Sequence, residues 1–289
     1  MNIFEIIKNN YNIDRELENI KKLLEEKFLY KVCYPDFLGP QCLFGKTTYY
    51  NIISIFDKYL SEWKSRNEIT SFDDFYKRIA GAYNSNHNLY EYRHILVLEC
   101  YINVINFVFL IIDKEGYKFE ECKKNILDGN IDILLDHLNY QKLFNKEMEQ
   151  ILLIPKNPEV IAVISDIENI EIANAIFKYN HYSLKGNIAE KRNLLIAIFN
   201  EYNTYLHNPV GGFAKEFKMA TFLENNCQIR HNNKSGDDKK EYVSNMEDKE
   251  LENMYDETYQ LVLFCILAKK NTDRMKLLQE KQKLITDKS

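Results

Sequence analysis

The chain contains few of the residues that shape tight turns. Among its 289 residues are only nine glycines and five prolines. Because glycine and proline mark the turns between short strands, their scarcity favours long helices over a many-stranded fold. The length suffices for about two domains or for one large helical domain. We therefore expect an all-α protein whose helices form a bundle.

The chain also lacks the paired cysteines of metal and redox motifs. Its six cysteines are scattered, and no two of them form a C-x-x-C pair. This spacing argues against a structural zinc site and against a thioredoxin-type motif. In a reducing cytosol the cysteines are expected to be small hydrophobic residues of the core. No G-x-S-x-G or Cys-His signature indicates covalent acyl chemistry.

An excess of positive charge is missing as well. The net charge is −5, so a contact with RNA has to come from a local basic site and not from a broad basic face. The first residues show no basic segment followed by an apolar run, the pattern of a secretory signal. The most apolar segment, residues 95–112, carries Glu99, Asn103 and Asn106, which favours a buried helix over a membrane span. We expect a cytoplasmic protein that does not contact a membrane.

One segment resembles a nucleotide-binding loop in part. Residues 39–47 read G-P-Q-C-L-F-G-K-T, with five residues between the glycines where a P-loop has four. A P-loop follows a strand, whereas no clear parallel-sheet pattern flanks this segment. The sequence therefore gives little support to nucleotide hydrolysis.

Two groups of residues resemble metal sites in part. Glu91 and His94 have the spacing of a di-iron ligand pair, but no second E-x-x-H occurs in the chain. Asp132, Asp136 and His137 fall on one expected helix, where a solvated face is the simpler interpretation. We expect no metal and no cofactor.

Helical periodicity runs through most of the first half of the chain. The expected helices cover residues 14–30, residues 47–64, a segment that opens with a capping box at Ser71–Asp74, and a central helix over residues 89–113. Shorter segments follow Gly116, and residues 140–151 close this half. The role of this half does not follow from its sequence.

The segment Ile154–Pro158 is the expected domain boundary. Its two prolines interrupt the helical pattern, and Asn157 followed by Pro158 is a helix start signal. We expect a helical N-terminal region over residues 1–153. A helical bundle over residues 154–272 and a charged tail over residues 273–289 follow.

The second half is expected to contain four helices that end near a polar site. They cover residues 158–182, 188–206, 213–229 and 249–269. A turn at Lys185–Asn187 separates the first two. The third helix delivers Arg230 and His231 at its C-terminal end, before a polar loop over residues 232–248.

The stretch Asn225–Asn233 crowds an arginine, a histidine and several amides into nine residues. Arginine holds a phosphate in a fork of donors, and histidine titrates near neutral pH. The sequence therefore predicts Arg230 and His231 as catalytic residues of metal-free chemistry on RNA. The expected substrate-binding residues are Asn226, Asn232, Asn233 and Lys234. The alternative is an Arg-His pair that fixes a helix end through backbone contacts.

The layout of the second half resembles the HEPN superfamily. The resemblance covers about residues 158–270. It is carried by Lys185–Asn187 with Lys191 and Arg192, by Cys227–Asn233, and by the Tyr-rich segment Met246–Gln260. Members of the superfamily are small helical bundles, and many are RNases of toxin, abortive-infection and CRISPR-associated systems. The resemblance implies a HEPN-like bundle packed on the helical first half.

The family motif is present here in a degenerate form. Active members carry an arginine, a polar residue and then a histidine a few residues further on. Arg230 and His231 match the first two positions, but no histidine follows His231. Because neighbouring helical residues point about 100° apart, the two cannot share a substrate directly. Either His231 acts with Arg230 of a second subunit, or the site does not cut.

Two functions remain open. The first is a metal-independent endoribonuclease of toxin or phage-defence type, a homodimer with RNA as its substrate. The second is a non-catalytic HEPN-like module that binds RNA or a partner protein, such as an antitoxin. In the second, Arg230, His231, Asp256 and Tyr259 are expected to form a buried polar network between the last two helices. Asp256 and Tyr259 are the supporting residues of the site.

Overall fold

The computed structural model describes residues 12–33, 46–64, 68–85, 87–145, 149–165, 167 and 169–286. Residues 39–45 of the P-loop-like segment lie outside these ranges. The chain divides into two compact units, Met1–Pro155 and Lys156–Ser289. Most described residues are helical, as the sequence predicts, but two small sheets are present that it does not predict.

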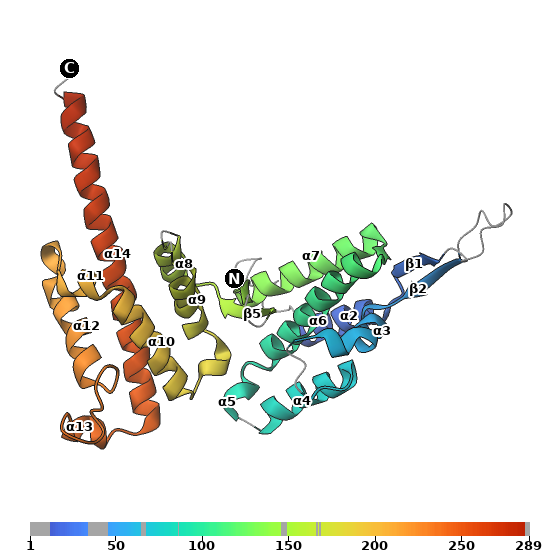
Figure 1. Cartoon of the computed structure of the whole chain (residues 1–289), viewed down its shortest axis with the longest axis horizontal. Coiled ribbons are helices and arrows are strands. Elements are labelled where there is room, and N and C mark those ends of the chain that lie inside the picture. Colours follow the sequence, from blue (N-terminus) through green and yellow to red (C-terminus); the bar gives the residue numbers. More distant parts are fainter. Residues whose placement is uncertain are drawn as a thin grey trace, which may run out of the picture. The chain divides into compact units, whose positions relative to one another are not determined.

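The first unit combines helices with short strands (Figure 1). Its helices are α2 (Ile13–Glu25), α3 (Ile52–Tyr59), η1 (Leu60–Glu62), α4 (Phe72–Ser85), α5 (His87–Tyr90), α6 (Arg93–Glu115) and α7 (Glu121–Leu138). Its strands are β1 (Leu29–Cys33), β2 (Lys46–Tyr50), β3 (Lys118–Phe119), β4 (Tyr140–Asn145) and β5 (Gln150–Pro155).

Helix α6 is the core of the first unit. Helices α2, α3 and α4 and strand β5 pack against it. By length and composition α6 could cross a membrane, but 72% of its most apolar window is buried inside the protein. Its polar side chains bind the backbone of β5: the Asn103 amide exchanges hydrogen bonds of 2.8 and 2.7 Å with Ile151, and Glu99 accepts from the Leu153 N–H at 2.6 Å. These bonds explain why a buried apolar helix carries a carboxylate and an amide.

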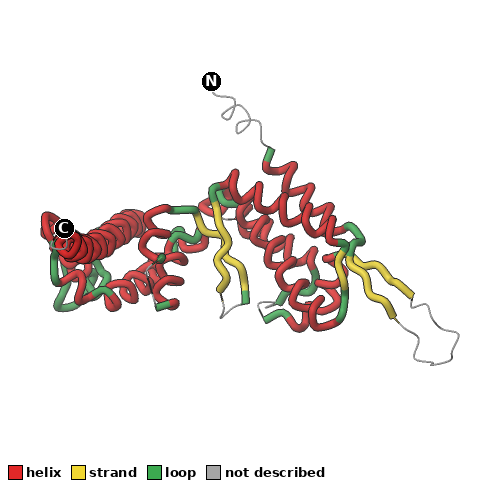
Figure 2. The backbone as a smooth tube through the Cα atoms, turned by 90° about the horizontal axis from the view of Figure 1, so that it is seen from above, coloured by secondary structure: helices red, strands yellow, loops and turns green. Residues whose placement is uncertain are grey.

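The strands form two separate antiparallel groups (Figure 2). One is a three-stranded sheet in the order β2-β1-β3, and the other is the hairpin β4-β5. The Thr-Thr-Tyr-Tyr run of β2 consists of residues that favour strands, so the helix expected over residues 47–64 begins only at Ile52. Asn51 opens that helix with a capping box to Ser54. The helix expected over residues 14–30 ends at Glu25 for the same reason, because β1 follows it.

The second unit is a helical bundle without strands among its described residues. Its elements are α8 (Pro158–Ile164), α9 (Ile170–Tyr179), η2 (Tyr182–Leu184), α10 (Ile188–Glu201), α11 (Asn203–His207), η3 (Gly211–Phe213), α12 (Ala214–Asn226), α13 (Glu241–Ser244) and α14 (Asp248–Thr286). Helix α14 packs against α8, α10, α11 and α12 (Figure 1). The expected charged tail continues this helix, and every described residue from Asp273 onward is exposed.

The cysteines follow the sequence prediction in part. Cys100, Cys227 and Cys265 are buried, as expected for small core hydrophobes, whereas Cys122 is exposed on the first turns of α7. The single tryptophan, Trp63, is buried beside Phe56 at a ring-centroid distance of 5.4 Å, and so is a core anchor.

Candidate functional site

The predicted site lies in an irregular loop and not at a helix end. Helix α12 ends at Asn226, three residues before the expected position, and Gln228 adopts a left-handed backbone with φ +60°. This conformation turns the chain back on the helix, because the Arg230 N–H then donates to the Glu224 carbonyl at 2.9 Å. The helical geometry expected for Arg230 and His231 therefore does not apply to them.

Arg230 forms an ion pair with a buried carboxylate. Its Nε lies 3.2 Å from Oε1 of Glu224, whose side chain is 3% exposed, whereas the Arg230 side chain is 38% exposed. The terminal nitrogens of Arg230 make no hydrogen bond or ion pair with the described residues. They are therefore free to bind a ligand while the Nε holds the side chain in place.

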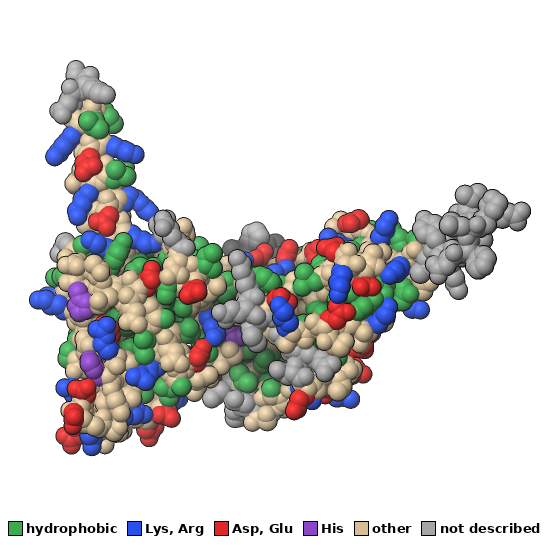
Figure 3. Space-filling model, viewed as in Figure 1, with side chains coloured by type: hydrophobic (Ala, Val, Ile, Leu, Met, Phe, Trp, Pro, Cys, Tyr) green, Lys and Arg blue, Asp and Glu red, His purple; other side chains and the backbone are tan. Residues whose placement is uncertain are grey.

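The buried Glu224 carboxylate has basic residues in its electrostatic environment. Burial raises the pKa of its carboxyl group above the usual value, although the charges of Arg230, His207 and His231 act in the opposite direction. Among these groups, His207 lies at the end of α11. Figure 3 shows histidine side chains together with Lys and Arg side chains on one face of the second unit.

His231 is an exposed side chain with an acidic neighbour. Its Nδ1 lies 3.4 Å from Oδ2 of Asp238, and the two side chains are 44% and 63% exposed. This contact orients the ring and leaves Nε2 for proton transfer. The sequence offers no motif for His207, because it precedes Arg230 by 23 residues and belongs to the short helix α11.

The amides of the site build the loop. Asn233 is 1% exposed; its side chain accepts from the Gln228 N–H at 2.8 Å and donates to the Asp238 carbonyl at 3.1 Å. Asn233 therefore has a structural role in the loop, and its contact with substrate remains a prediction. Asn226 bonds to its own helix at Phe222 O, 2.8 Å away.

Asn232 and Lys234 remain accessible. The Asn232 side chain is exposed and bonds to Gln228 and Ser235 within the loop. The ammonium group of Lys234 lies 3.2 Å from Oδ1 of Asp248 at the start of α14.

Two side chains of the helical bundle bind the backbone of the loop. The Tyr255 hydroxyl of α14 donates to the Gln228 carbonyl at 3.1 Å, and Nε of Arg192 on α10 donates to the Ile229 carbonyl at 3.0 Å. The carbonyls on either side of the left-handed turn are thus satisfied, so the position of Arg230 is set by the bundle.

Asp256 and Tyr259 belong to a different network, so the expected network that joins them to Arg230 and His231 is wrong. Lys191 is the centre of theirs: its Nζ lies 2.7 Å from Asp256 and 2.8 Å from Glu252. The Tyr179 hydroxyl donates to Asp256 at 3.0 Å, and its ring stacks on Tyr259 at 4.1 Å. The Lys191 network joins α9, α10 and α14, and Arg230 takes no part in it.

The partial metal motifs have other contacts. Nε2 of His94 lies 2.8 Å from Oδ1 of Asp14, and Asp132 pairs with Lys142 at 3.2 Å. Across the described ranges, no three His, Cys, Asp or Glu side chains lie together in an arrangement that could hold a metal ion.

Comparisons with known proteins give no match: no protein-family model, no curated protein and no solved structure matches this chain.

Proposed function

We propose that the second unit is a HEPN-like module that cleaves RNA without a metal ion, with Arg230 at its centre. The observation that carries the proposal is the ion pair between Arg230 and Glu224. Only the Nε is bound, and a buried carboxylate holds it, so the terminal nitrogens are presented in a fixed direction. Such a fork matches the geometry of a phosphate.

The chemistry is an internal transfer of the phosphate ester. The ribose 2′-oxygen forms a bond to the neighbouring phosphorus, and the bond from phosphorus to the 5′-oxygen of the next nucleotide breaks. Arg230 stabilises the negative charge that develops on the phosphate oxygens. One imidazole accepts the 2′-hydroxyl proton, and a protonated imidazole supplies a proton to the leaving 5′-oxygen. The products are a cyclic phosphate and a 5′-hydroxyl.

His231 and His207 fill the two proton-transfer roles. The resemblance to HEPN nucleases leaves one histidine missing after His231, and we assign the second role to His207 of α11. A second subunit is then not needed to complete the pair. Lys234 and Asn232 hold the backbone of the RNA beside Arg230. The resemblance to toxin and abortive-infection proteins favours a cytoplasmic defence role, a homodimer and an antitoxin or other protein partner.

Growth of a bacterial host tests this function. Induction of the wild-type chain should arrest growth and produce new RNA fragments on a gel of total RNA. Arg230→Ala, His231→Ala and His207→Ala should each prevent both effects. Arg274→Ala changes an exposed arginine of α14 and serves as the control that should behave as the wild type does. Fragmentation by Arg230→Ala, or arrest with intact RNA, contradicts the proposal.

A second function is favoured by the same ion pair. Because Glu224 is buried and the loop is fixed by Tyr255 and Arg192, Arg230 could serve the fold of a non-catalytic module that binds RNA or a partner protein. In that case Arg230→Ala should leave a buried carboxylate unpaired and lower the melting temperature. In a nuclease the same change should also remove cleavage, so the loss of cleavage and not the melting temperature separates the two functions.

A further inference from the structure

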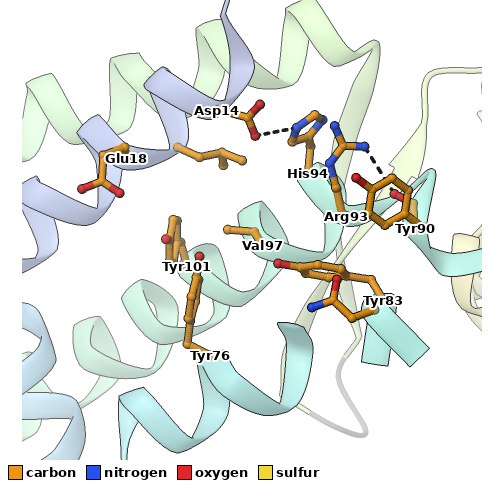
Figure 4. Close-up of a pocket in the computed structure, with 11 residues that line it drawn as sticks. Asp14, Glu18, Tyr76, Tyr83, Tyr90, Arg93, His94, Val97 and Tyr101 are labelled. Atoms are coloured by element: carbon orange, nitrogen blue, oxygen red, sulfur yellow. Dashed lines mark hydrogen bonds and ion pairs between the residues drawn. The ribbon is translucent and has the colours of Figure 1, made fainter. Parts of the chain in front are cut away.

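The first unit contains a polar cavity that is unrelated to the Arg230 site. It has a volume of about 280 Å³ and lies between α2, α4, α5 and α6 (Figure 4). Its lining includes four tyrosines and two basic residues: Tyr76, Tyr83, Tyr90, Tyr101, Arg93 and His94. Aromatic rings, a guanidinium and an imidazole in one cavity are the groups that bind a planar ligand with an anionic substituent.

The four tyrosine rings lie in two contacting pairs. Tyr76 and Tyr101 are nearly parallel, with an interplanar angle of 7° and ring centroids 6.3 Å apart, whereas Tyr83 and Tyr90 meet at 67° and 6.5 Å. The Tyr83 hydroxyl points toward the middle of the cavity in Figure 4 and makes no hydrogen bond with the described residues. A ligand with a hydrogen-bonding edge would satisfy it. Burial raises the pKa of the Tyr83 phenol, so it remains a donor at neutral pH.

A guanidinium lies beside Tyr90 at the cavity. Arg93 and His94 are the first residues of the 23-residue helix α6. The positive end of the helix dipole therefore adds to the charge of Arg93. The guanidinium lies over the Tyr90 ring at 4.7 Å, with one N–H of it 3.5 Å from the Tyr90 carbonyl. These contacts orient Arg93 and leave further donors for an anion.

The cavity also carries two carboxylates, those of Asp14 and Glu18. The Asp14 carboxylate pairs with His94 at 2.8 Å. The Glu18 carboxylate lies away from Arg93 in Figure 4, beyond Tyr101. An anion is thus favoured at the Arg93 end, and a hydrogen-bond donor such as an exocyclic amine is favoured at the Glu18 end.

We propose that this cavity binds a single nucleotide, with its phosphate at Arg93 and the first turn of α6 and its base among the tyrosine rings. Base stacking on tyrosine is tolerant of sequence, because every base has a π-face. Ligand cavities usually measure about 300–1,000 Å³, so a volume at the lower end of this range suits one nucleotide and not a longer chain. The nucleotide is either a free nucleoside monophosphate or the terminal residue of an RNA strand.

Calorimetric titration of the full chain tests this inference. AMP and GMP are the probes, with adenosine, ribose 5-phosphate and inorganic phosphate as probes that lack one half of the ligand. We expect at least one nucleotide to bind at least tenfold more tightly than each of these fragments. A short RNA with a 5′-phosphate distinguishes the sources: equal or tighter binding than AMP indicates a strand end, and weaker binding a free nucleotide.

Two substitutions separate the parts of the cavity. Arg93→Gln should weaken nucleotide binding about tenfold or more and leave adenosine binding nearly unchanged. Tyr83→Phe keeps the ring and removes the hydroxyl. It should therefore weaken nucleotide binding and adenosine binding by the same small factor. Lys77→Gln, on α4 outside the cavity, is the control for charge removal. The inference is overturned if no nucleotide binds at millimolar concentration, or if Lys77→Gln weakens nucleotide binding as much as Arg93→Gln does. Neither result depends on whether the Arg230 site cleaves RNA.

Discussion

Glu224 and Arg230 form an ion pair in which only the carboxylate is buried: its side chain is 3% exposed, and that of the arginine is 38% exposed. The partly exposed guanidinium is held at its Nε, 3.2 Å from the carboxylate, and keeps its terminal donors. A buried carboxylate of this kind stabilises the position of Arg230 at the expense of its own solvation.

Glu224→Gln should therefore make the protein more stable at neutral pH and less active on RNA. The folded-state pKa of Glu224 is raised above its unfolded value by burial, so ionisation destabilises the folded protein as the pH rises through this range. The stability gained by Glu224→Gln should grow as the pH rises from the ordinary glutamate pKa of 4.5 through the raised pKa of the folded state. Urea unfolding at several pH values measures it, with exposed Glu257→Gln as the control. A gain that shrinks with rising pH contradicts the account.

Lys191→Met should strongly destabilise the second unit. The ammonium is 7% exposed and neutralises Glu252 and Asp256, so its removal leaves two carboxylates facing each other. Breaking a buried pair costs about 3 kcal/mol or more. Lys178→Met is the matched control: its partner Glu190 lies near the surface, and such pairs contribute roughly 1 kcal/mol or less. Equal effects of both substitutions on the free energy of unfolding would exclude a special role for Lys191.

The Lys191 network should also affect how the stability of the protein changes at acidic pH. Burial raises the pKa of Glu252, but hydrogen bonds from Lys191 and the Gly186 N–H outweigh it and leave the pKa lowered. A carboxyl group with a lowered folded-state pKa stabilises the protein above its unfolded pKa, and this stabilisation is lost as the pH falls through the folded-state pKa. Glu252→Gln should therefore lose less stability than the wild type on acidification from neutral pH. A parallel loss in both proteins would disprove it.

Asn233→Ala should unfold the loop that carries Arg230 and His231. The change removes the acceptor of the Gln228 N–H and the donor to Asp238 O, and a buried group left unpaired costs about 1–3 kcal/mol. Asn232→Ala alters an exposed neighbour and should cost clearly less. Hydrogen exchange of the Gln228 amide is the measurement. Unchanged protection in Asn233→Ala is the contrary result.

Removal of residues 275–289 should leave the bundle intact. The described residues of this segment are exposed, and the ammonium of Lys270, which donates to the Val163 carbonyl at 3.0 Å, is retained. The melting temperature should change by less than about 2 °C, because exposed positions contribute little to stability. Thermal unfolding followed by circular dichroism measures this temperature. A larger drop in the melting temperature would show that this part of α14 has a structural contact.

The helical character of the fold follows from the sequence, but its strands do not. Ser71 caps α4 by accepting from the Asp74 N–H at 3.1 Å, as its local sequence predicts. The pairing of residues 46–50 with 29–33 and of 140–145 with 150–155 depends on partners outside the local window. Short apolar runs are compatible with either a helix or a strand. For this reason the local sequence of residues 140–151 does not reveal the β4-β5 hairpin.

The site is predictable only as far as residue chemistry allows. The short stretch identifies Arg230 and His231 as accessible polar residues, but the partner of Arg230 is a glutamate six residues earlier that the turn at Gln228 brings back. His207 and the tyrosine cavity depend on tertiary packing between helices, for which the sequence carries no local signal. Burial likewise decides that Asn233 serves the loop.

Cleavage of a labelled RNA by the purified chain in the presence of EDTA tests the central claim most directly. The account predicts fragments that end in a cyclic phosphate with the wild type and no fragments with Arg230→Ala. Intact RNA with the wild type, or fragments that require a divalent metal, would contradict it.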